Sequence, residues 1–578
     1  MSILPELKDR FRQALTGLVD NPAELLQLIR PSQEPKFGDY QANLAMSLGK
    51  RLGRPPRELA AEIVARLRVD DLCQPPEIAG PGFINLRIKD DWLAGRLLAA
   101  VADPRLDIAP VAAPRSFVID YSAPNVAKPM HVGHIRSTVI GDALCRVLRF
   151  LGHTVTSDNH IGDWGTQFGM ILYGYKHFLD AEAYRRNPVE ELARLYRHVR
   201  PLMDAHPEIN TDVLAETAKL HAGDPENRRL WEQFLPHCED EIQRVYARLG
   251  VRFDHTLGES FYEDRLAGVV DELLRRGLAR ESDGAICIFL EGQKTPMIVR
   301  KKDGAFLYGT TDLATIQYRM ETWKPDAILY VVDHRQSLHF QQLFATARLL
   351  GHKDVELQHV SFGTVLGDDG RPFKTRSGDT VGLESLLDEA VRRALEIVSA
   401  NDDAKPDGPE LSPEQRREVA ETVGIAALKY ADLSQNRTSD YVFSYDKMLA
   451  MTGNTATYMQ YAYARVRSIF AKGEVDVESL RASGAPILLG SPAERALALE
   501  ILRFSEALEI TVADYRPNQL TSYLFDLANR YSTFFERCHV LRAESDPLRQ
   551  SRLLLCDLTA RTIQKGLELL GIKVIEKM

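Results

Sequence analysis

The sequence predicts an α/β protein built on a Rossmann-like parallel sheet, with a small α+β domain before it and an all-α region after it. The apolar strand SFVIDY is followed by a helical stripe and by a second strand, HTVTSDN, in the strand-helix-strand order of parallel sheets. More strands, including AILYVVD, resume after a long charged helical stretch. At 578 residues the chain exceeds what one hydrophobic core can organise, so several domains are expected.

The first predicted domain spans residues 1–110. It combines a helical start with the strand-like PGFINLRI and ends in DPRLDIAPVAAPR, a proline-rich stretch typical of a linker. The second spans 111–383 and contains the sheet. Its first helix has apolar residues at helical spacing, and Gly152 ends it. These residues are Ile135, Val139, Ala143, Val147 and Leu151.

A helical insertion is predicted at about 171–285, because this stretch is charged and lacks strand alternation until AICIFL. The last predicted domain, 384–578, consists of successive helices to the end of the chain. No internal repeat or low-complexity tract interrupts this order. In this order the parallel sheet lies in the middle of the chain, and we expect the functional site at that sheet.

Composition indicates a globular protein, with 44% hydrophobic and 26% charged residues. No apolar run is long enough for a bilayer, and MSILPELKDR lacks the order of a signal peptide, so no membrane partner and a cytoplasmic location are expected. The net charge of −9 argues weakly against nucleic acid, although phosphates respond to local rather than average charge. Six scattered cysteines without a CxxC pair predict buried thiols and no zinc site. They are Cys73, Cys145, Cys238, Cys287, Cys538 and Cys556.

The sequence His131-Val132-Gly133-His134 lies where the first strand of the parallel sheet gives way to its helix. The carboxyl ends of parallel strands form a ligand crevice, and the helix N-terminus offers free N–H groups to an anion such as a triphosphate. Two histidines three apart lie on one side of the first turn, where ring N–H groups can stabilise charge on phosphates. Gly133 leaves room for a flat adenine ring.

An HxGH pattern alone is weak, because two surface histidines usually have no function. The longer string DYSAPNVAKPMHVGHIRSTVIGDAL, however, resembles the signature of the arginyl-tRNA synthetases, class I aminoacyl-tRNA synthetases, in their bacterial form. The resemblance continues in NHIGDWGTQFG, KKDGAFLYGTTDLAT, VVDHRQSLHFQQLF and QYAYARVRS, and so spans nearly the whole chain. It implies an arginine–tRNA ligase that activates L-arginine with ATP and Mg²⁺ and transfers it from arginyl-adenylate to tRNA(Arg).

The resemblance implies an ATP site between Ala123 and His134. Its implied members are Ala123, Pro124, Asn125, His131, Gly133, His134, Lys374 and Arg376. The second class signature, a KMSKS-type loop, is degenerate here: PFKTRSGD has Thr375 where the second lysine belongs. Lys128 is expected to supply the missing positive charge and so joins His131 and His134 as a catalytic residue. The alternative is that Lys374 and Arg376 only keep a glycine-rich loop solvated.

The implied arginine site consists of Tyr308, Asp312 and Gln336, together with Asn125 and His134. A carboxylate that accepts two N–H bonds from the planar guanidinium discriminates arginine from lysine, and a tyrosine can offer its ring face or hydroxyl. The alternative for Asp312 is an N-cap of the helix LATIQYRM, for which the neighbouring threonines would also serve.

The segment YMQYAYARVRSIF interleaves aromatic residues and arginines, which suits unstacked anticodon bases and their phosphates. The alternative is a core helix with a solvated face. By resemblance, the last domain binds the anticodon, the C-terminal tail lies near it, and the first domain contacts the outer corner of the tRNA. The candidate tRNA contacts are Tyr458, Tyr461, Tyr463, Arg465, Met578, Phe37 and Tyr40.

Three other functions compete with this prediction. Another class I synthetase or a small-molecule adenylyltransferase would share the sheet and the HxGH turn, but a carboxylate at Asp312 is not expected there. A non-catalytic tRNA-binding paralogue is opposed by the intact His131 and His134. An oxidoreductase is opposed by the lack of GxGxxG after the first strand. The resemblance also favours a monomer.

Overall fold

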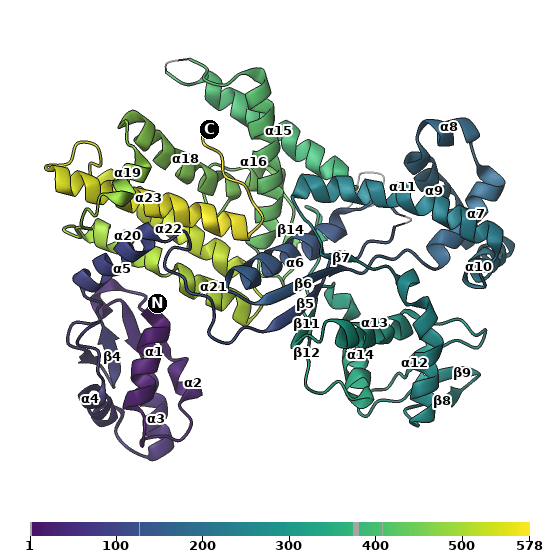
Figure 1. Cartoon of the computed structure of the whole chain (residues 1–578), viewed down its shortest axis with the longest axis horizontal. Coiled ribbons are helices and arrows are strands. Elements are labelled where there is room, and N and C mark those ends of the chain that lie inside the picture. Colours follow the sequence, from purple (N-terminus) through teal and green to yellow (C-terminus); the bar gives the residue numbers. More distant parts are fainter. Residues whose placement is uncertain (1–2, 127, 374–380, 407, 578) are drawn as a thin grey trace.

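The computed structural model describes residues 3–126, 128–373, 381–406 and 408–577 (Figure 1). A central parallel sheet separates a helical C-terminal part, with the N-terminal domain beneath it, from a second set of helices on the other side (Figure 1). Within these ranges no helix is long and apolar enough to cross a membrane. The α/β class with a helical insertion, an α+β first domain and an all-α last part is therefore confirmed.

The N-terminal domain is a four-stranded antiparallel sheet with helices packed on it. The strand order is β1-β2-β4-β3. Strand β2 pairs with the PGFINLRI strand β4 so that Tyr40 lies opposite Leu86. Its elements are α1 (Ile3–Ala14), α2 (Ala23–Leu26), β1 (Ile29–Pro31), η1 (Pro35–Phe37), β2 (Tyr40–Ala42), α3 (Leu44–Leu52), α4 (Pro56–Arg66), β3 (Glu77–Ala79) and β4 (Phe83–Leu86), followed by α5 (Asp90–Ala102).

The central sheet has five parallel strands in the order β12-β11-β5-β6-β7. From β5 the chain proceeds outward to β6 and β7, and it later returns to the other side through β11 and β12. The strand order therefore reverses between β5 and β11, and ligands bind at the carboxyl edge of such a switch point. The strands are β5 (Ser116–Asp120), β6 (Thr154–Asn159), β7 (His255–Thr256), β11 (Ala327–Tyr330) and β12 (Glu356–His359).

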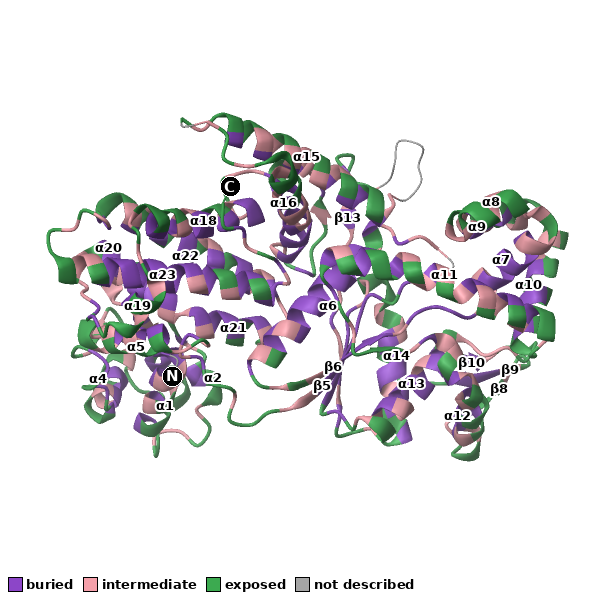
Figure 2. Ribbon diagram, turned by 45° about the horizontal axis from the view of Figure 1, so that its top comes forward, coloured by how far each residue is buried: buried purple, intermediate pink, exposed green. Residues whose placement is uncertain are grey.

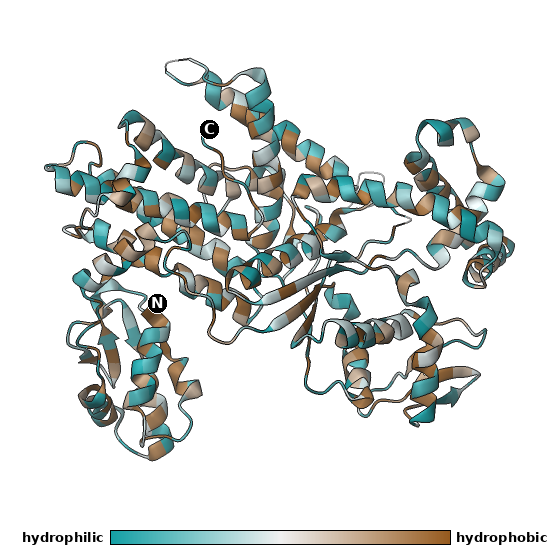
Figure 3. Ribbon diagram, viewed as in Figure 1, coloured by the Kyte–Doolittle hydropathy of each residue, from teal (hydrophilic) through white to brown (hydrophobic). Residues whose placement is uncertain are grey.

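The helix after β5, α6 (Val132–Phe150), carries the predicted histidines at its start. Its apolar stripe, from Ile135 to Val147, is buried. Figure 2 shows buried residues along α6 and along the neighbouring strands β5 and β6. The hydropathy colouring of Figure 3 shows the same central strands as largely hydrophobic. The predicted strand-helix-strand unit is confirmed at this position.

The insertion between β6 and β7 consists of five helices and is shorter than expected. They are α7 (Thr166–Phe178), α8 (Ala181–Arg186), α9 (Pro188–Ala205), α10 (Pro207–His221) and α11 (Pro225–Leu249). The helical stretch ends at Leu249 rather than near 280, because the chain returns to the sheet at β7. A strand of two residues is too short to produce a readable alternation.

The chain between β7 and the C-terminal helices completes the sheet and adds a small antiparallel sheet, β10-β9-β8. These elements are η2 (Glu259–Tyr262), α12 (Glu263–Arg275), β8 (Ala279–Ser282), β9 (Ala285–Ile288), β10 (Met297–Arg300), α13 (Tyr308–Thr322), η3 (His334–Gln336), α14 (Ser337–Leu350) and β13 (Val365–Leu366). Helix α13 leads into β11 and α14 follows it, so both helices begin near the carboxyl edge of that strand.

The C-terminal part is helical and shares one hydrophobic core with the sheet domain. Its elements are α15 (Leu383–Asp403), α16 (Pro413–Leu433), β14 (Tyr441–Val442), α17 (Tyr445–Met448), α18 (Ala456–Lys472), α19 (Val477–Ala482), α20 (Pro492–Leu502), α21 (Phe504–Ala513), α22 (Asn518–Arg537) and α23 (Asp546–Leu569). Strand β14 pairs in parallel with β13, and α16 packs on α6. The helix that carries the histidine pair is thus supported by the C-terminal helices.

Polar contacts join the N-terminal domain to these helices. Arg495 of α20 donates two hydrogen bonds, of 2.8 and 2.7 Å, to the carboxylate of Asp39. The hydroxyl of Tyr40 donates to Glu506 of α21 at 2.6 Å. Burial raises the pKa of Glu506 to about 7. The second contact occupies Tyr40, which the sequence suggested as an RNA contact.

Candidate active site

Two histidines form the first turn of α6. Nδ1 of His131 accepts the backbone N–H of Gly133 at 3.1 Å, and Nδ1 of His134 accepts the backbone N–H of His131 at 3.0 Å. The two ring centroids lie 4.0 Å apart. A Cβ on Gly133 would lie 2.9 Å from the His131 ring, so this contact requires glycine. Because both Nδ1 atoms accept hydrogen bonds, each neutral ring carries its proton on Nε2.

Both histidines are held in the neutral form. Burial, together with electrostatic repulsion from His131 and Lys128, lowers the pKa of His134 to about 3. The pKa of His131 is lowered by burial and by Lys128. The pair therefore offers two Nε2–H donors rather than two cations, and the nearby positive charge belongs to Lys128.

The loop between β5 and α6 is fixed by the loop after β6. Ala123 has a left-handed backbone, with φ of +43°, and its N–H donates to Oδ1 of Asn159 at 3.1 Å. Gly162 donates its N–H to the carbonyl of Pro124 at 3.0 Å. A Cβ on Gly162 would lie 2.3 Å from Oδ1 of Asn125. The backbone that leads to His131 is thereby preorganised.

The predicted arginine residues lie at the starts of α13 and α14. Tyr308 is the first residue of α13 and is 63% exposed, and Asp312 follows one turn later. Oδ2 of Asp312 lies 2.6 Å from Nε2 of His339 in α14, and the rings of Tyr308 and His339 are 4.9 Å apart. Gln336 is exposed one turn before His339.

This geometry excludes the alternative that Asp312 caps the helix. Helix α13 begins at Tyr308, so Asp312 lies in its second turn. Thr310 is occupied as well, because its hydroxyl donates to the carbonyl of Val299. The carboxylate is therefore free of a capping role and has His339 as its hydrogen-bond partner.

Two residues beside these were missed by sequence reasoning. His339 lies in the string VVDHRQSLHFQQLF, one helical turn after Gln336, and that spacing was a usable signal. Glu259 follows β7, whose two residues gave no strand signal. Burial raises the pKa of Glu259 to about 7; the charges of Asp163 and Asp312 raise it and that of His160 lowers it. Glu259 is therefore a half-buried carboxyl group within electrostatic range of Asp312.

Lys128 lies between the histidine pair and the insertion. Its ammonium is 5.4 Å from the ring centroid of Tyr196 in α9, within the range of a cation–π contact. Two further predicted ATP residues, Lys374 and Arg376, lie outside the described residues.

The four candidate RNA residues of α18 have different environments. Tyr461 is 41% exposed. Tyr458 is half-buried, with its hydroxyl 3.2 Å from Oδ1 of Asn529, and Arg465 stacks on Phe535 at 4.0 Å. Tyr463 is buried and donates to Glu576 of the tail, so its prediction as an RNA contact is corrected: it holds the tail. The predicted contact Met578 lies outside the described residues.

The prediction for Tyr40 is also corrected, because its side chain is fully buried against Glu506 and cannot reach RNA. Phe37 remains half-buried, with the ammonium of Lys36 over its ring at 4.8 Å. The buried contact of Tyr40 with Glu506 joins the N-terminal domain to the C-terminal helices. The pattern of hydrophobic residues in the sequence does not indicate such a contact between domains.

A groove of about 410 Å³ lies between the N-terminal domain and α20 and α22. Its lining contains five arginines and two carboxylates, Asp39 and Glu500. Two of the arginines pair with those carboxylates. The five are Arg87, Arg495, Arg503, Arg530 and Arg537. This acidic protein therefore has a locally basic groove at a domain boundary.

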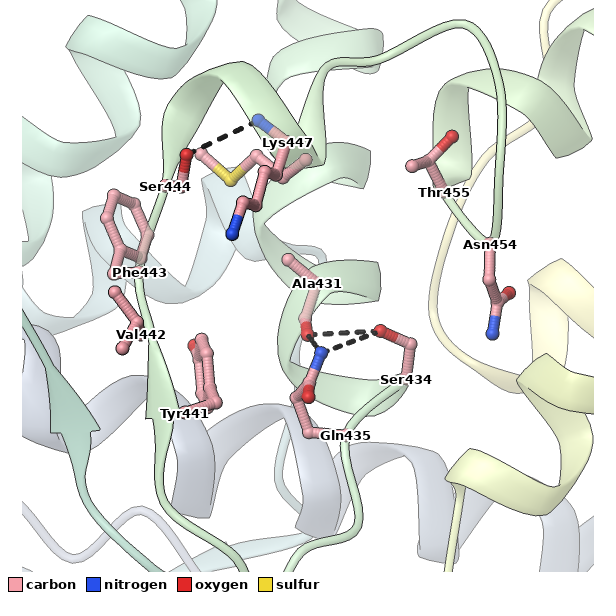
Figure 4. Close-up of a pocket in the computed structure, with 11 residues that line it drawn as sticks. Ala431, Ser434, Gln435, Tyr441, Val442, Phe443, Ser444, Lys447, Asn454 and Thr455 are labelled. Carbon is pink, nitrogen blue, oxygen red and sulfur yellow. Dashed lines mark hydrogen bonds between the residues drawn. The ribbon is translucent and has the colours of Figure 1, made fainter. Parts of the chain in front are cut away.

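A smaller pocket, of about 170 Å³, lies between α16, β14, α17 and the start of α18 (Figure 4). Gln435 donates to the carbonyl of Ala431 and to Ser434 at its floor, and Ser444 caps α17 by accepting the N–H of Lys447. Neither this pocket nor the groove is lined by the predicted ATP or arginine residues.

The six cysteines are buried and unpaired, as predicted. In the ranges that the structure covers, no three His, Cys, Asp or Glu side chains gather as metal ligands. The expected lack of zinc stays a prediction.

Three family descriptions match the chain. "tRNA synthetases class I (R), catalytic domain" covers residues 101–445, "DALR anticodon binding domain" covers 459–578, and "Arginyl tRNA synthetase N terminal domain" covers 5–88. The arginine–tRNA ligase of Rhodopirellula baltica is 48% identical over 99% of both chains. That of Synechococcus elongatus is 44% identical over 100% of this chain and 99% of its own.

Solved structures agree. Arginyl-tRNA synthetase from Plasmodium falciparum superimposes with a TM-score of 0.84 at 29% identity, covering 100% of this chain and 99% of its own. The Thermus thermophilus enzyme gives 0.81 at 25% identity over 100% of both chains.

The parallel sheet, the histidine pair at its switch point and the catalytic-domain match define a class I aminoacyl-tRNA synthetase. Within that class the three matched regions occur together, and the relatives align from end to end. The chain belongs to the arginyl-tRNA synthetase family.

Proposed function

We propose that the crevice at the carboxyl ends of β5, β7 and β11 is the active site of the ligase reaction. As a member of its family the chain is an arginine–tRNA ligase, which charges tRNA(Arg) with arginine at the expense of ATP. One observation carries the assignment: neutral N–H donors lie on the β5 side, and the Asp312 and Glu259 carboxyl groups lie on the β11 and β7 sides. The ATP triphosphate is negatively charged and the arginine guanidinium is positively charged. This arrangement offers N–H donors to the first and carboxyl groups to the second.

The ATP triphosphate lies at the N-terminus of α6. The Nε2–H groups of His131 and His134 and the free backbone N–H groups of the first turn donate to phosphate oxygens. Lys128 adds a positive charge, and Mg²⁺ enters with the nucleotide. Ala123, Pro124 and Asn125 form the preorganised backbone beside the adenosine, and Lys374 and Arg376 are assigned to the same site from the sequence alone.

The arginine guanidinium lies between Asp312 and Glu259. Because His339 occupies Oδ2 of Asp312, Oδ1 remains for the guanidinium. A bound guanidinium favours the charged form of Glu259, whose pKa is raised in the substrate-free site. Tyr308 contributes its ring face and Gln336 its amide, while Asn125 and His134 face the amino-acid end. Lysine lacks the planar fork that two carboxylates recognise.

The chemistry is two displacements. The arginine carboxylate attacks the α-phosphorus of ATP, a new P–O bond forms, and pyrophosphate leaves with the electrons of the broken P–O bond. A terminal ribose hydroxyl of the tRNA then attacks the adenylate carbonyl, and AMP leaves. The chain's residues position the reactants and offset developing charge, and no covalent enzyme intermediate is required.

The tRNA extends from the active site to the C-terminal helices. The exposed ring of Tyr461, with Tyr458 and Arg465 beside it, is proposed to contact anticodon bases. The five-arginine groove is proposed to contact backbone phosphates near the outer corner, with Phe37 at its side. Local charge at the groove reconciles RNA binding with a net charge of −9.

The domain organisation is proposed to follow this division: residues 1–110 bind the outer corner, 111–383 catalyse, and 384–578 contact the stem and anticodon. A cytoplasmic monomer is proposed as the working form. The function as a whole is tested by charging purified tRNA with labelled arginine and, separately, labelled lysine. Arginine-specific, ATP-dependent charging is expected; charging with lysine at a comparable rate would contradict the proposed pocket.

A further inference from the structure

A lysine buried among three helices links the catalytic and the anticodon-binding regions. Lys429 of α16 is 1% exposed. Its ammonium donates to the carbonyl of Leu249 at 2.7 Å and to that of Gly571 at 2.6 Å, and it lies 3.7 Å from Oδ2 of Asp142. Leu249 ends α11 of the insertion, Gly571 follows α23, and Asp142 belongs to α6. One charged group thus holds three elements.

The contact uses the chemistry of helix ends. The last carbonyls of a helix lack intrahelical partners and carry partial negative charge, which a cation stabilises. Lys429 serves the end of α11 in this way through Leu249, and it also binds the carbonyl of Gly571, two residues beyond the end of α23. Arg146 of α6 completes the cluster by bonding Asp142 at 2.9 Å and the carbonyl of Gly250 at 2.8 Å.

Gly571 fits this cluster because it lacks a side chain. Its φ is +69°, and an added Cβ would lie 2.5 Å from Oδ2 of Asp142 and 2.6 Å from Nζ of Lys429. The tail that starts here returns along α18. Gln460 donates to the carbonyl of Lys573, and Tyr463 donates to Glu576. The cluster therefore anchors one end of a segment whose other end contacts the anticodon helix.

The catalytic end of the link is α6 itself. Asp142 lies about 16 Å along the axis of α6 from His131, at 1.5 Å of rise per residue. A second buried pair, Arg136 with Asp432 at 3.1 Å, joins the same two helices closer to the histidines. Helix α6 is thus fixed to α16 at two charged points, of which only the Lys429 point also holds the tail.

Burying an ammonium costs several kcal/mol of desolvation even when a carboxylate such as Asp142 lies beside it, and apolar packing would serve stability as well or better. Burial lowers the pKa of Lys429 to about 8, which reflects this cost. Retaining the lysine therefore points to a role in fixing relative positions rather than in stability alone.

We propose that Lys429 is a positioning residue through which the anticodon-side tail sets the position of α6, so that the effect of the anticodon on the rate of charging depends on it. The proposal rests on the proposed anticodon contact at α18 and the tail. It differs from a purely structural role in one respect: removing Lys429 must remove the rate advantage of the correct anticodon and leave its binding advantage intact.

The test compares wild type, Lys429→Met and a control, Lys565→Met, each with natural tRNA(Arg) and with the same tRNA carrying an altered anticodon. Lys565 lies on α23 with its ammonium 5.7 Å from the ring of Phe150 at the end of α6, but it pairs with Glu568 at the surface rather than with the tail that follows Gly571. Charging kcat at saturating tRNA and the tRNA Kd are measured for each combination. Thermal unfolding of each variant shows that it is folded at the assay temperature.

In wild type and Lys565→Met, the altered anticodon is expected to raise Kd and to lower kcat by roughly 5- to 150-fold, the usual range of coupling between sites. In Lys429→Met, kcat with natural tRNA should already be low, and the altered anticodon should lower it no further while still raising Kd. If the altered anticodon instead lowers the kcat of Lys429→Met by the same factor as it lowers that of wild type, the two substitutions act independently and Lys429 has no positioning role.

Two other results separate this proposal from the proposed function. An altered anticodon that changes only Kd in wild type leaves the anticodon contact standing and overturns the role of Lys429. An altered anticodon that changes neither quantity removes the anticodon contact and this proposal together. If Lys429→Met does not fold, Gly571→Ala carries the test, because it keeps the lysine and crowds the tail away from it; the same loss of rate coupling is expected.

Discussion

Asp312 and His339 are joined by a 2.6 Å hydrogen bond across the start of α13 and α14. An ionised carboxylate can only accept, so Nε2–H of His339 donates to Oδ2. The bond fixes the plane of the carboxylate and leaves Oδ1 for a ligand. It also explains how an aspartate in the second turn of a helix is held toward a neighbouring helix rather than toward its own backbone.

Asp312→Asn is expected to raise the arginine KM by roughly 30- to 800-fold, corresponding to about 2 to 4 kcal/mol for a desolvated charge pair. The amide keeps the shape of the side chain but loses the charge that matches the guanidinium. Arginine-dependent pyrophosphate exchange measures the arginine KM. The KM for ATP is expected to stay within about twofold of the wild-type value.

The matched control for this substitution is Asp303→Asn, a nearby carboxylate in an exposed turn that bonds only the N–H of Ala305. It should leave the arginine KM unchanged. An unaltered arginine KM in Asp312→Asn would remove Asp312 from the pocket.

Acid should destabilise the wild type more than His134→Gln. The pKa of His134 is about 3 in the folded chain and about 6.5 when unfolded, so between these values the unfolded chain binds more protons at this residue. The stability from the neutral ring is present above pH 6.5 and is lost as the pH falls towards 3. The Tm of wild type minus that of the variant should therefore decrease from pH 7 to pH 4. A difference that stays constant with pH would show that His134 is not held neutral.

Substituting Arg530 and Arg537 together by Gln should weaken tRNA binding and flatten its salt dependence. Each lost phosphate contact removes about 0.7 to 0.9 from the slope of log K against log salt. Filter binding over a salt series measures both effects. Arg185→Gln with Arg265→Gln is the control, because both arginines are at least partly exposed, pair with glutamates and lie outside the parts of the chain proposed to bind RNA. Equal slopes in the two double variants would argue against RNA in the groove.

Tyr461→Ala and Tyr463→Ala should change different properties: the first should weaken tRNA binding, and the second should lower the stability of the fold. Loss of the exposed Tyr461 ring should raise the tRNA Kd by roughly 5- to 150-fold, for about 1 to 3 kcal/mol of stacking, and leave Tm unchanged. Loss of the buried Tyr463 ring should cost about 3 to 5 kcal/mol of stability. Melting curves and tRNA titration separate the two; a lower Tm for Tyr461→Ala would show that its role is in the core.

Much of the fold could be predicted from the sequence, because the patterns that indicate its strands, helices and turns lie within short segments. The strand at SFVIDY, the stripe from Ile135 and the turn at Gly133 depend on neighbouring residues, and the structure contains each of them. The end of the insertion could not be predicted, because β7 has two residues and is a strand only through pairing with β6.

The site could be predicted only where single residues carry the chemistry. His131, His134 and Asp312 were proposed from the sequence, whereas His339 and Glu259 come close to Asp312 only through elements that are distant in sequence or on another helix. Tyr40 and Tyr463 illustrate the reverse case. An aromatic residue in a polar string is compatible with RNA stacking and with a buried domain contact, and only burial distinguishes the two.

The measurement that tests the central claim most directly is exchange of labelled pyrophosphate into ATP, with arginine or lysine, and with or without deacylated tRNA(Arg). We predict exchange with arginine and none with lysine. The mixtures with and without tRNA show whether activation depends on bound RNA, and either result keeps the proposed active site. No exchange in any mixture, from protein shown to be folded, would contradict the active site proposed at α6 and α13.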